Sequence, residues 1–233
     1  MRIIKNTIVS SLLLLTVLAS LLGSCAKAEL PATISIGALL SSTGSGSAYA
    51  ATQKNGIELA VSEINSTKFL GQGKELKVIF MDTGSTADGA ATAMTTLLDQ
   101  NVAAIIGPTL SAEALKADPL AQKKGIPVMG ISNTVAGITE MGSFIFRDSL
   151  PESSVIDGTI KAVSEKLNVK KVGILWGESE AFTVGGYDAF TAALKKYSVE
   201  VQIDRTFKQG DTDFNAQILD IIAAKPDAIC VSA

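Results

Sequence analysis

The stretch from 102 to 134, which reads VAAIIGPTLSAEALKADPLAQKKGIPVMGISNT, constrains the fold more than any other part of the chain. Two short apolar runs, 102–106 and 126–131, have the length and composition of buried strands. Between them a helical pattern extends from Ser111 to about Gly125, and glycine commonly follows the end of a helix. The stretch therefore predicts one strand–helix–strand unit of a parallel sheet.

Small hydroxyl residues follow both predicted strands of this unit. Ser111 comes after the first strand, at the start of the helix, and Ser132 and Thr134 come directly after the second. The carboxyl ends of neighbouring parallel strands share one edge of a sheet, where ligands bind. Free N–H groups at a helix start also attract anionic groups. We therefore expect a crevice that binds a carboxylate or similar polar group. Caps and turns are the structural alternative, because serine and threonine favour both.

Strand and helix patterns alternate along the rest of the chain, which predicts parallel sheets with helices on both faces. The expected strands are 33–40, 77–81, 102–106, 128–131, 144–147, 171–176, 199–207 and 227–231. The expected helices are 49–65, 85–100, 111–124, 153–167, 182–197 and 211–224.

Local signals refine three of these helices. Ser85 and Asp88 resemble a capping box at the start of one helix. Gly185-Gly186 is expected to interrupt another, and Asp211 and Asp213 favour the start of the last.

The alternating pattern divides near residues 148–152. We expect an α/β protein of two lobes, 33–150 and 151–233, with a cleft between them. The chain stops within its last predicted strand, so the second lobe is expected to be incomplete and the sequence to be a fragment.

Residues 1–24 have the pattern of an export signal. Two basic residues precede an apolar segment from Ile8 to Leu22, the order found in secretory signal peptides. The next residues complete the sequence Leu-Gly-Ser-Cys, which resembles the lipobox of bacterial lipoproteins. That resemblance implies cleavage before Cys25 and a diacylglycerol on its thiol, with residues 25–32 as a tether. An ordinary signal peptide with an incidental cysteine is the alternative.

Composition excludes several classes of protein. The chain has 20 basic and 23 acidic residues, a formal net charge of −3, and no histidine. Mild acidity argues against nucleic acid as a partner. Without histidine, Ser-His-Asp catalysis and His-based metal sites are impossible. Cys25 and Cys230 provide no disulfide framework, and the glycine-rich segment 44–47 lacks the spacing of a nucleotide-binding loop. We expect no cofactor, no metal and no enzymatic activity.

Nine segments occur in order along the chain, namely ISIGALLSSTGSGSAYA, NGIELAVSEIN, LKVIFMDTGS, IIGPTLS, IPVMGISNT, FIFRDSLPE, KKVGILWGES, GDTDFNAQI and KPDAI. Together they resemble the type I periplasmic binding proteins. The most similar branch is the branched-chain amino acid (Leu/Ile/Val) binding proteins of ABC importers, and the resemblance covers Thr33 to the end of the chain. It implies two Rossmann-like lobes joined by a hinge, with the ligand between them, and the absence of the C-terminal part of such a protein.

The resemblance also implies roles for single residues. Ser111 would bind the ligand's carboxylate through its hydroxyl and N–H, Ser132 through its backbone and Thr134 through its hydroxyl. Tyr49 corresponds to an aromatic residue that flanks the ligand. Phe182 falls near a tyrosine that packs over the ligand, so an apolar wall without a hydroxyl is expected there.

Alternatives exist for three further assignments. Tyr49 could be a packed residue in the first turn of its helix, and Trp176 could form the wall in place of Phe182. Glu152 falls where the family carries an acid near the hinge, but we expect it to be a solvated charge at a helix start. The family's main acid for a ligand's ammonium group lies beyond Ala233.

These observations predict a monomeric, extracytoplasmic substrate-binding protein that a lipid anchor holds on a bacterial membrane. Its expected partners are an ABC permease and a small ligand, an amino acid or a related carboxylate or amide. The ligand would dock on the first lobe, and closure of the second would then produce the form that engages the permease. A sensor subunit of the same build and an exported α/β enzyme are the alternatives.

Overall fold

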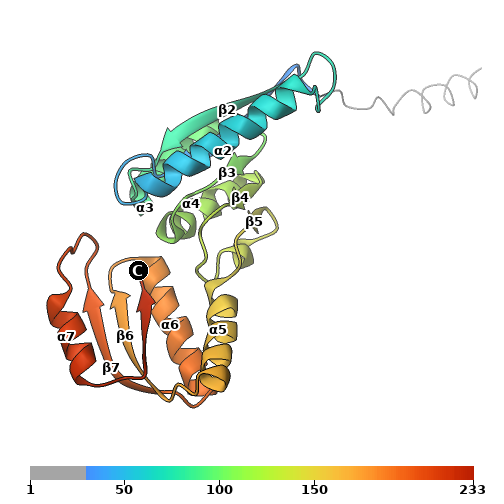
Figure 1. Cartoon of the computed structure of the whole chain (residues 1–233). Helices are drawn as coiled ribbons and strands as arrows, with labels where there is room; N and C mark the ends of the chain where they lie inside the picture. Colours follow the sequence, from blue (N-terminus) through green and yellow to red (C-terminus); the bar gives the residue numbers. More distant parts are fainter. Residues whose placement is uncertain (1–29) are drawn as a thin grey trace, which may run out of the picture. The chain divides into compact units, whose positions relative to one another are not determined.

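The computed structural model describes residues 30–233, so the expected signal segment and Cys25 lie outside the described residues. Residues 33–233 form one unit that contains two parallel sheets with flanking helices (Figure 1). This arrangement confirms the α/β class expected from the alternating pattern. No helix between residues 30 and 233 has the length and hydrophobicity needed to span a bilayer.

The first sheet has five strands in the order β2-β1-β3-β4-β5. The chain passes from β1 to β2 on one side and then continues from β3 to β5 on the other, so the order reverses between β1 and β3. Such a switch point creates a crevice at the carboxyl ends of the strands. The strands are β1 (Thr33–Leu40), β2 (Glu75–Asp82), β3 (Ile105–Ile106), β4 (Val128–Gly130) and β5 (Ile145–Arg147). The helices are α2 (Ser47–Ser66), α3 (Ala87–Asp99), α4 (Ser111–Lys124) and the 3-10 helix η1 (Thr139–Met141).

The second sheet has three strands in the order β7-β6-β8, so its order also reverses beside its first strand. The carboxyl ends of β6 and β8 therefore form a second crevice of the same kind. The strands are β6 (Lys171–Gly177), β7 (Glu200–Phe207) and β8 (Ala228–Ser232). The helices are α5 (Glu152–Lys166), α6 (Ala181–Lys196) and α7 (Asn215–Ala223).

Residues 37–40 of β1 are buried on both faces, as expected for a central parallel strand. Leu39 belongs to a core cluster with Met94 and Leu97 of α3, whereas Leu40 belongs to a separate cluster with Ile57 of α2. Successive side chains of a strand point to opposite faces. Helices therefore cover both faces of the first sheet, as the sequence predicts.

The structure corrects the starts of two helices. Helix α3 is capped by Thr86, whose Oγ1 accepts a hydrogen bond from the N–H of Gly89 at 3.0 Å, and not by Ser85. Helix α7 begins at Asn215 and not at 211. Asp211 accepts the N–H of Lys208 within the preceding loop at 2.7 Å, whereas Asp213 accepts the N–H of Asn215, the first residue of α7, at 3.0 Å and so supports the helix start as expected. Aspartate favours such turns as strongly as helix starts.

The expected interruption of α6 at Gly185-Gly186 is also wrong, because the helix is continuous from Ala181 to Lys196. A Cβ at Gly186 would lie 2.1 Å from Oγ of Ser232, and one at Gly185 would lie 2.9 Å from a methyl group of Val135. The two glycines therefore let α6 approach β8 and the segment after β4 closely, at a cost in helix propensity that this packing offsets.

Candidate functional site

The site begins at the turn between β3 and α4. Gly107 has a φ of 104°, in the left-handed region that favours glycine. A Cβ at this position would lie 2.1 Å from the carbonyl oxygen of Leu39. The chain therefore passes directly over β1, and the next residues reach the switch point between β1 and β3.

Ser111 is the first residue of α4 and is 2% exposed. Its Oγ accepts hydrogen bonds from the N–H groups of Thr134 at 3.2 Å and Val135 at 3.5 Å, which joins the start of α4 to the segment after β4. Among the described residues its hydroxyl proton has no acceptor. Ser111 can therefore still donate a hydrogen bond to a ligand.

The hydroxyl of Ser132 is fully used within the protein. It donates to the carbonyl oxygen of Thr109 and accepts from Nε2 of Gln53 at 2.9 Å. Oγ1 of Thr109 in turn donates to Oε1 of Gln53 at 2.8 Å. The hydroxyl groups at both strand ends are thus fixed by one amide from α2. No feature of the sequence distinguishes Gln53 from an ordinary surface glutamine, so the sequence reasoning missed it.

Thr134 has a different environment. Its N–H is bound by Ser111, and its carbonyl oxygen accepts the N–H of Glu152 at 3.1 Å. Its Oγ1 is buried and has no partner among the described residues, although Thr134 does not line the neighbouring pocket. A buried hydroxyl without a partner is unfavourable. This oxygen is therefore available to a further group.

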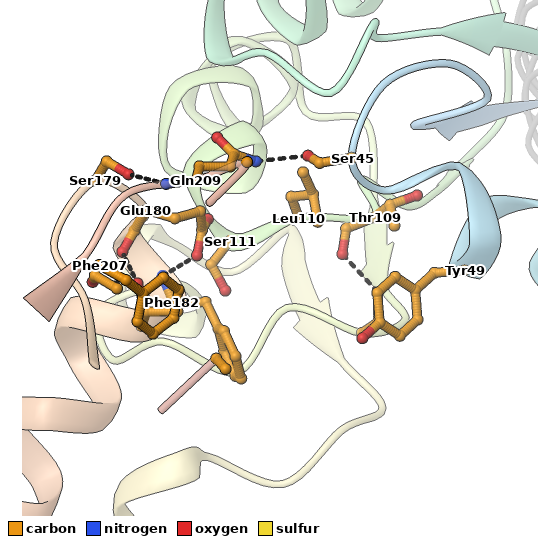
Figure 2. A pocket seen from close by; sticks show the side chains of 15 residues that line it. Ser45, Tyr49, Thr109, Leu110, Ser111, Ser179, Glu180, Phe182, Phe207 and Gln209 are labelled. Atoms are coloured by element: carbon orange, nitrogen blue, oxygen red, sulfur yellow. Dashed lines mark hydrogen bonds between the residues drawn. The ribbon is translucent and has the colours of Figure 1, made fainter. Parts of the chain in front are cut away.

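A pocket of about 350 Å³ lies between the carboxyl ends of the two sheets (Figure 2). This volume is within the range of small-molecule sites. Four of the five residues expected to contact a ligand line it, namely Tyr49, Ser111, Ser132 and Phe182. The structure thus brings residues from both sheets to one cavity.

Aromatic rings form part of the pocket wall. Tyr49, in the first turn of α2, is 62% exposed, so it is not the packed residue considered as an alternative. Phe182 of α6 and Phe207 at the end of β7 line the side that belongs to the second sheet. Trp176, the other possible wall, instead stacks on Tyr187 with ring centroids 4.2 Å apart and does not line the pocket.

Two polar contacts connect the two sides of the pocket, and Figure 2 shows the one between Gln209 and Ser45. Nε2 of Gln209, in the loop after β7, donates to Oγ of Ser45 in the loop after β1 at 2.6 Å. Oε1 of Glu180, which precedes α6, accepts the N–H of Ala112 in the first turn of α4 at 3.3 Å. Neither contact is visible in the sequence, because the partners are far apart along the chain.

Glu152 is the first residue of α5, and its Oε2 is buried without a partner among the described residues. Burial and the negative charge of Glu180 raise the pKa of Glu152 to about 7. The reading of Glu152 as a solvated charge is therefore wrong. Glu152 and Glu180 therefore lie close enough for their negative charges to repel.

Helix α4 also carries two fully buried acids that the sequence reasoning missed. Glu113 accepts hydrogen bonds from Oγ of Ser41 at 2.7 Å, from Oγ1 of Thr83 and from the N–H of Leu110 at 3.0 Å. It therefore ties the ends of β1 and β2 to the start of α4. Asp118 has no partner for either carboxylate oxygen among the described residues, and burial raises its pKa to about 8.

Comparisons with known proteins agree with this geometry. A family model described as "Periplasmic binding protein" matches residues 33–233. The chain belongs to the periplasmic binding proteins. It is similar to Leu/Ile/Val-binding proteins and to leucine- and branched-chain amino acid-binding proteins of known structure, the group that the sequence resemblance names. No group of three or more acidic or cysteine side chains within residues 30–233 could hold a metal ion.

Two curated relatives illustrate the similarity of this periplasmic binding protein to other members. It is 27% identical over 216 residues to the Leu/Ile/Val-binding protein BraC3 of Rhizobium johnstonii, covering 92% of this chain and 58% of the relative. It is 24% identical over 200 residues to the Leu/Ile/Val-binding protein homolog 3 of Brucella melitensis, covering 85% and 54%. The chain therefore spans a little over half the length of the curated relatives that it matches.

Solved structures show the same relationship. The LivJ substrate-binding protein of Streptococcus pneumoniae, determined in complex with isoleucine, has a TM-score of 0.77 and 33% identity, over 85% of this chain and 56% of LivJ. The leucine-binding protein LivK of Thermotoga maritima has a TM-score of 0.76 and 26% identity, over 85% and 55%. The fold of the periplasmic binding proteins therefore extends through both sheets described above.

Proposed function

We propose that this periplasmic binding protein binds a branched-chain amino acid, or a closely related small carboxylate, and delivers it to an ABC importer. The observation that carries the proposal is the pocket of about 350 Å³ into which both sheets place their carboxyl ends, with Ser111 in its wall. The names of the relatives and the isoleucine bound to the similar LivJ support the ligand class.

The ligand's carboxylate would bind at the start of α4. Ser111 supplies a hydroxyl donor there, and the first-turn N–H groups of a helix need acceptors from outside the helix. Neutral donors of this kind bind an anion through charge-assisted hydrogen bonds. The aliphatic part of the ligand would pack against Leu110, Phe182 and Phe207, which line the same pocket.

Closure would involve the two sides of the pocket. In this proposal residues 33–150 and 151–233 act as two lobes, and the ligand favours the closed arrangement because it contacts both. The contacts of Gln209 with Ser45 and of Glu180 with Ala112 lie where such closure would be sensed. The closed form would then engage a membrane permease from an extracytoplasmic position.

The contribution of Ser111 can be tested by replacing it with alanine. Ser111→Ala is expected to weaken isoleucine binding by about 1–3 kcal/mol, because it removes one charge-assisted hydrogen-bond donor. Isothermal titration calorimetry would measure the change. Ser154→Ala, at an exposed serine of α5, is the matched control and should leave affinity unchanged. Equal affinities for both variants would contradict the role of Ser111, and no binding of leucine, isoleucine or valine to the unsubstituted chain would contradict the ligand class.

We also propose that Cys25 carries the lipid that anchors the protein. Cys25→Ser is then expected to move the protein from the membrane fraction to the soluble fraction of a bacterial host and to abolish incorporation of a labelled fatty acid. Cys230→Ala is the control, since Cys230 is buried in β8 and should not affect labelling. Retention of the label in Cys25→Ser would show that the lipid, if any, is attached elsewhere.

A further inference from the structure

Gln53 of α2 does not line the pocket, yet its side-chain amide binds two hydroxyl groups that do. Its Nε2 donates to Oγ of Ser132 at 2.9 Å, and its Oε1 accepts the hydroxyl of Thr109 at 2.8 Å. Oγ of Ser132 also donates to the carbonyl oxygen of Thr109. These three hydrogen bonds form a closed ring that joins α2 to the turn after β3 and to the end of β4.

The ring is consistent with only one arrangement of its protons. A carbonyl oxygen can only accept, so the hydroxyl proton of Ser132 points at Thr109. Ser132 must therefore accept from Gln53, which requires the NH2 end of the amide on this side. Oγ1 of Thr109 accepts the N–H of Ser41 at 3.1 Å and donates its own proton to the amide oxygen. The amide of Gln53 thus matches both hydroxyl groups, one as donor and one as acceptor.

This arrangement gives the hydroxyl residues of the pocket wall two different characters. The protons of Thr109 and Ser132 are used within the ring, so their side-chain oxygens present only lone pairs to the pocket. Ser111 is the reverse. Its Oγ accepts the N–H groups of Thr134 at 3.2 Å and Val135 at 3.5 Å, and its proton has no acceptor among the described residues. A carboxylate oxygen, which can only accept, therefore finds a hydroxyl donor at Ser111 and none at the other two.

We propose that Gln53 is a positioning residue, which fixes the hydroxyl protons of Thr109 and Ser132 and so determines where on this wall a ligand's carboxylate can bind. Without the amide, these two hydroxyl groups are free to turn their protons toward the pocket, and Ser111 is no longer distinguished from them. This inference rests on the proposed function and deepens it, because it concerns how the same pocket orients its ligand.

The test exchanges the two hydrogen-bonding characters of the amide while keeping its shape. Gln53→Glu replaces the NH2 group by an oxygen. An ionised glutamate can only accept, so it cannot donate to Ser132, whereas a protonated glutamate has one donor and one acceptor oxygen and can restore the ring. Gln53→Met removes both characters at every pH. Gln72→Glu is the matched control, because it makes the same change of charge at an exposed position in the loop between α2 and β2.

Calorimetry with isoleucine would compare each variant with the unsubstituted chain at pH 8 and at pH 5, which cancels the titration of the acids that the proteins share. Gln53→Glu is expected to bind about tenfold more weakly than the unsubstituted chain at pH 8, the effect of one lost hydrogen bond. At pH 5 its affinity should return to within about twofold of the unsubstituted chain. Gln53→Met should be weakened by a similar factor at both pH values, and Gln72→Glu at neither. Urea unfolding of the same samples would establish that each variant is folded.

Two outcomes would overturn the inference and leave the proposed function intact. If Gln53→Glu binds isoleucine as tightly as the unsubstituted chain at pH 8, the ligand does not sense the ring. If Gln53→Glu is as weak at pH 5 as at pH 8, its defect comes from packing and not from the placement of protons. If the unsubstituted chain binds none of leucine, isoleucine and valine, the proposed function itself fails, and the inference fails with it.

Discussion

Replacing Asp118 by asparagine is expected to raise the free energy of unfolding at pH 8 on the order of 5 kcal/mol. Asp118 is fully buried in α4, and neither carboxylate oxygen has a partner among the described residues. Burial penalises the charged form and raises the pKa of Asp118 from its ordinary 3.8 to about 8. The side chain is therefore neutral in the folded protein at neutral pH, and asparagine is its neutral isostere.

The sign of the pH dependence follows from these two pKa values. Between about pH 4 and pH 8 the folded state holds a proton on Asp118 that the unfolded state has released. The contribution of Asp118 to stability is therefore fully present below about pH 4, falls as pH rises through this window and levels off above about pH 8. The gain from Asp118→Asn should accordingly be near zero at pH 4 and largest at pH 8.

Urea unfolding of both proteins at a series of pH values would measure the effect. The control is Asp188→Asn, at an exposed aspartate in the middle of α6, which makes the same chemical change without burial. Its stability should differ from that of the unsubstituted chain by less than about 0.5 kcal/mol at every pH. A parallel pH dependence of Asp118→Asn and the unsubstituted chain would show that Asp118 is ionised or hydrated when the protein is folded.

The opposite result is expected at the other buried acid of the same helix. Glu113→Ala should lower the free energy of unfolding by about 3–5 kcal/mol, because three donors lose a charged acceptor. These are the hydroxyls of Ser41 and Thr83 and the N–H of Leu110. Glu113→Gln should lower the free energy of unfolding less, by about 2 kcal/mol. One oxygen remains as an acceptor, but the new amide NH2 group would point at hydrogen-bond donors.

Denaturant unfolding at constant pH would rank these variants. Glu63→Ala, at an exposed glutamate of α2, provides the matched control and should change stability by less than about 0.5 kcal/mol. If Glu113→Ala were as stable as Glu63→Ala, the three hydrogen bonds of Glu113 would contribute nothing to stability. Replacing the two buried acids of α4 is thus predicted to change stability in opposite directions, because the two acids differ in their hydrogen-bond partners and not in their burial.

Much of the fold could be predicted from local pattern. Helix α4 begins at Ser111 and ends at Lys124 as expected, because Gly125 in the left-handed conformation terminates it. Strand β1 matches its predicted bounds, since its apolar run is buried on both faces. Predictions near polar residues were less accurate. Strand β3 pairs only at Ile105–Ile106. Asp211 serves the loop before α7 and only Asp213 contacts the helix start, because the same residue type suits several local structures.

The place of the site could also be predicted, since parallel strands end at one edge. Tyr49, Ser111, Ser132 and Phe182 line the pocket, and their individual roles toward a ligand stay predictions. The polar contacts of Glu180 could not be anticipated. They depend on how two sheets pack against each other, and residues 112 and 180 have no relationship within the sequence pattern. Buried acids are equally hard to recognise, because glutamate and aspartate on a helix usually face solvent.

The hydrogen bond between Ser45 and Gln209 joins positions 164 residues apart. Each strand–helix unit can form from segments that are neighbours in the sequence. This contact, in contrast, forms only after most of the chain is correctly placed, because closing a very long loop has a large entropic cost. The cavity is therefore expected to be among the last parts of the molecule to assemble. A small molecule that fits the cavity would therefore slow unfolding more than it accelerates folding.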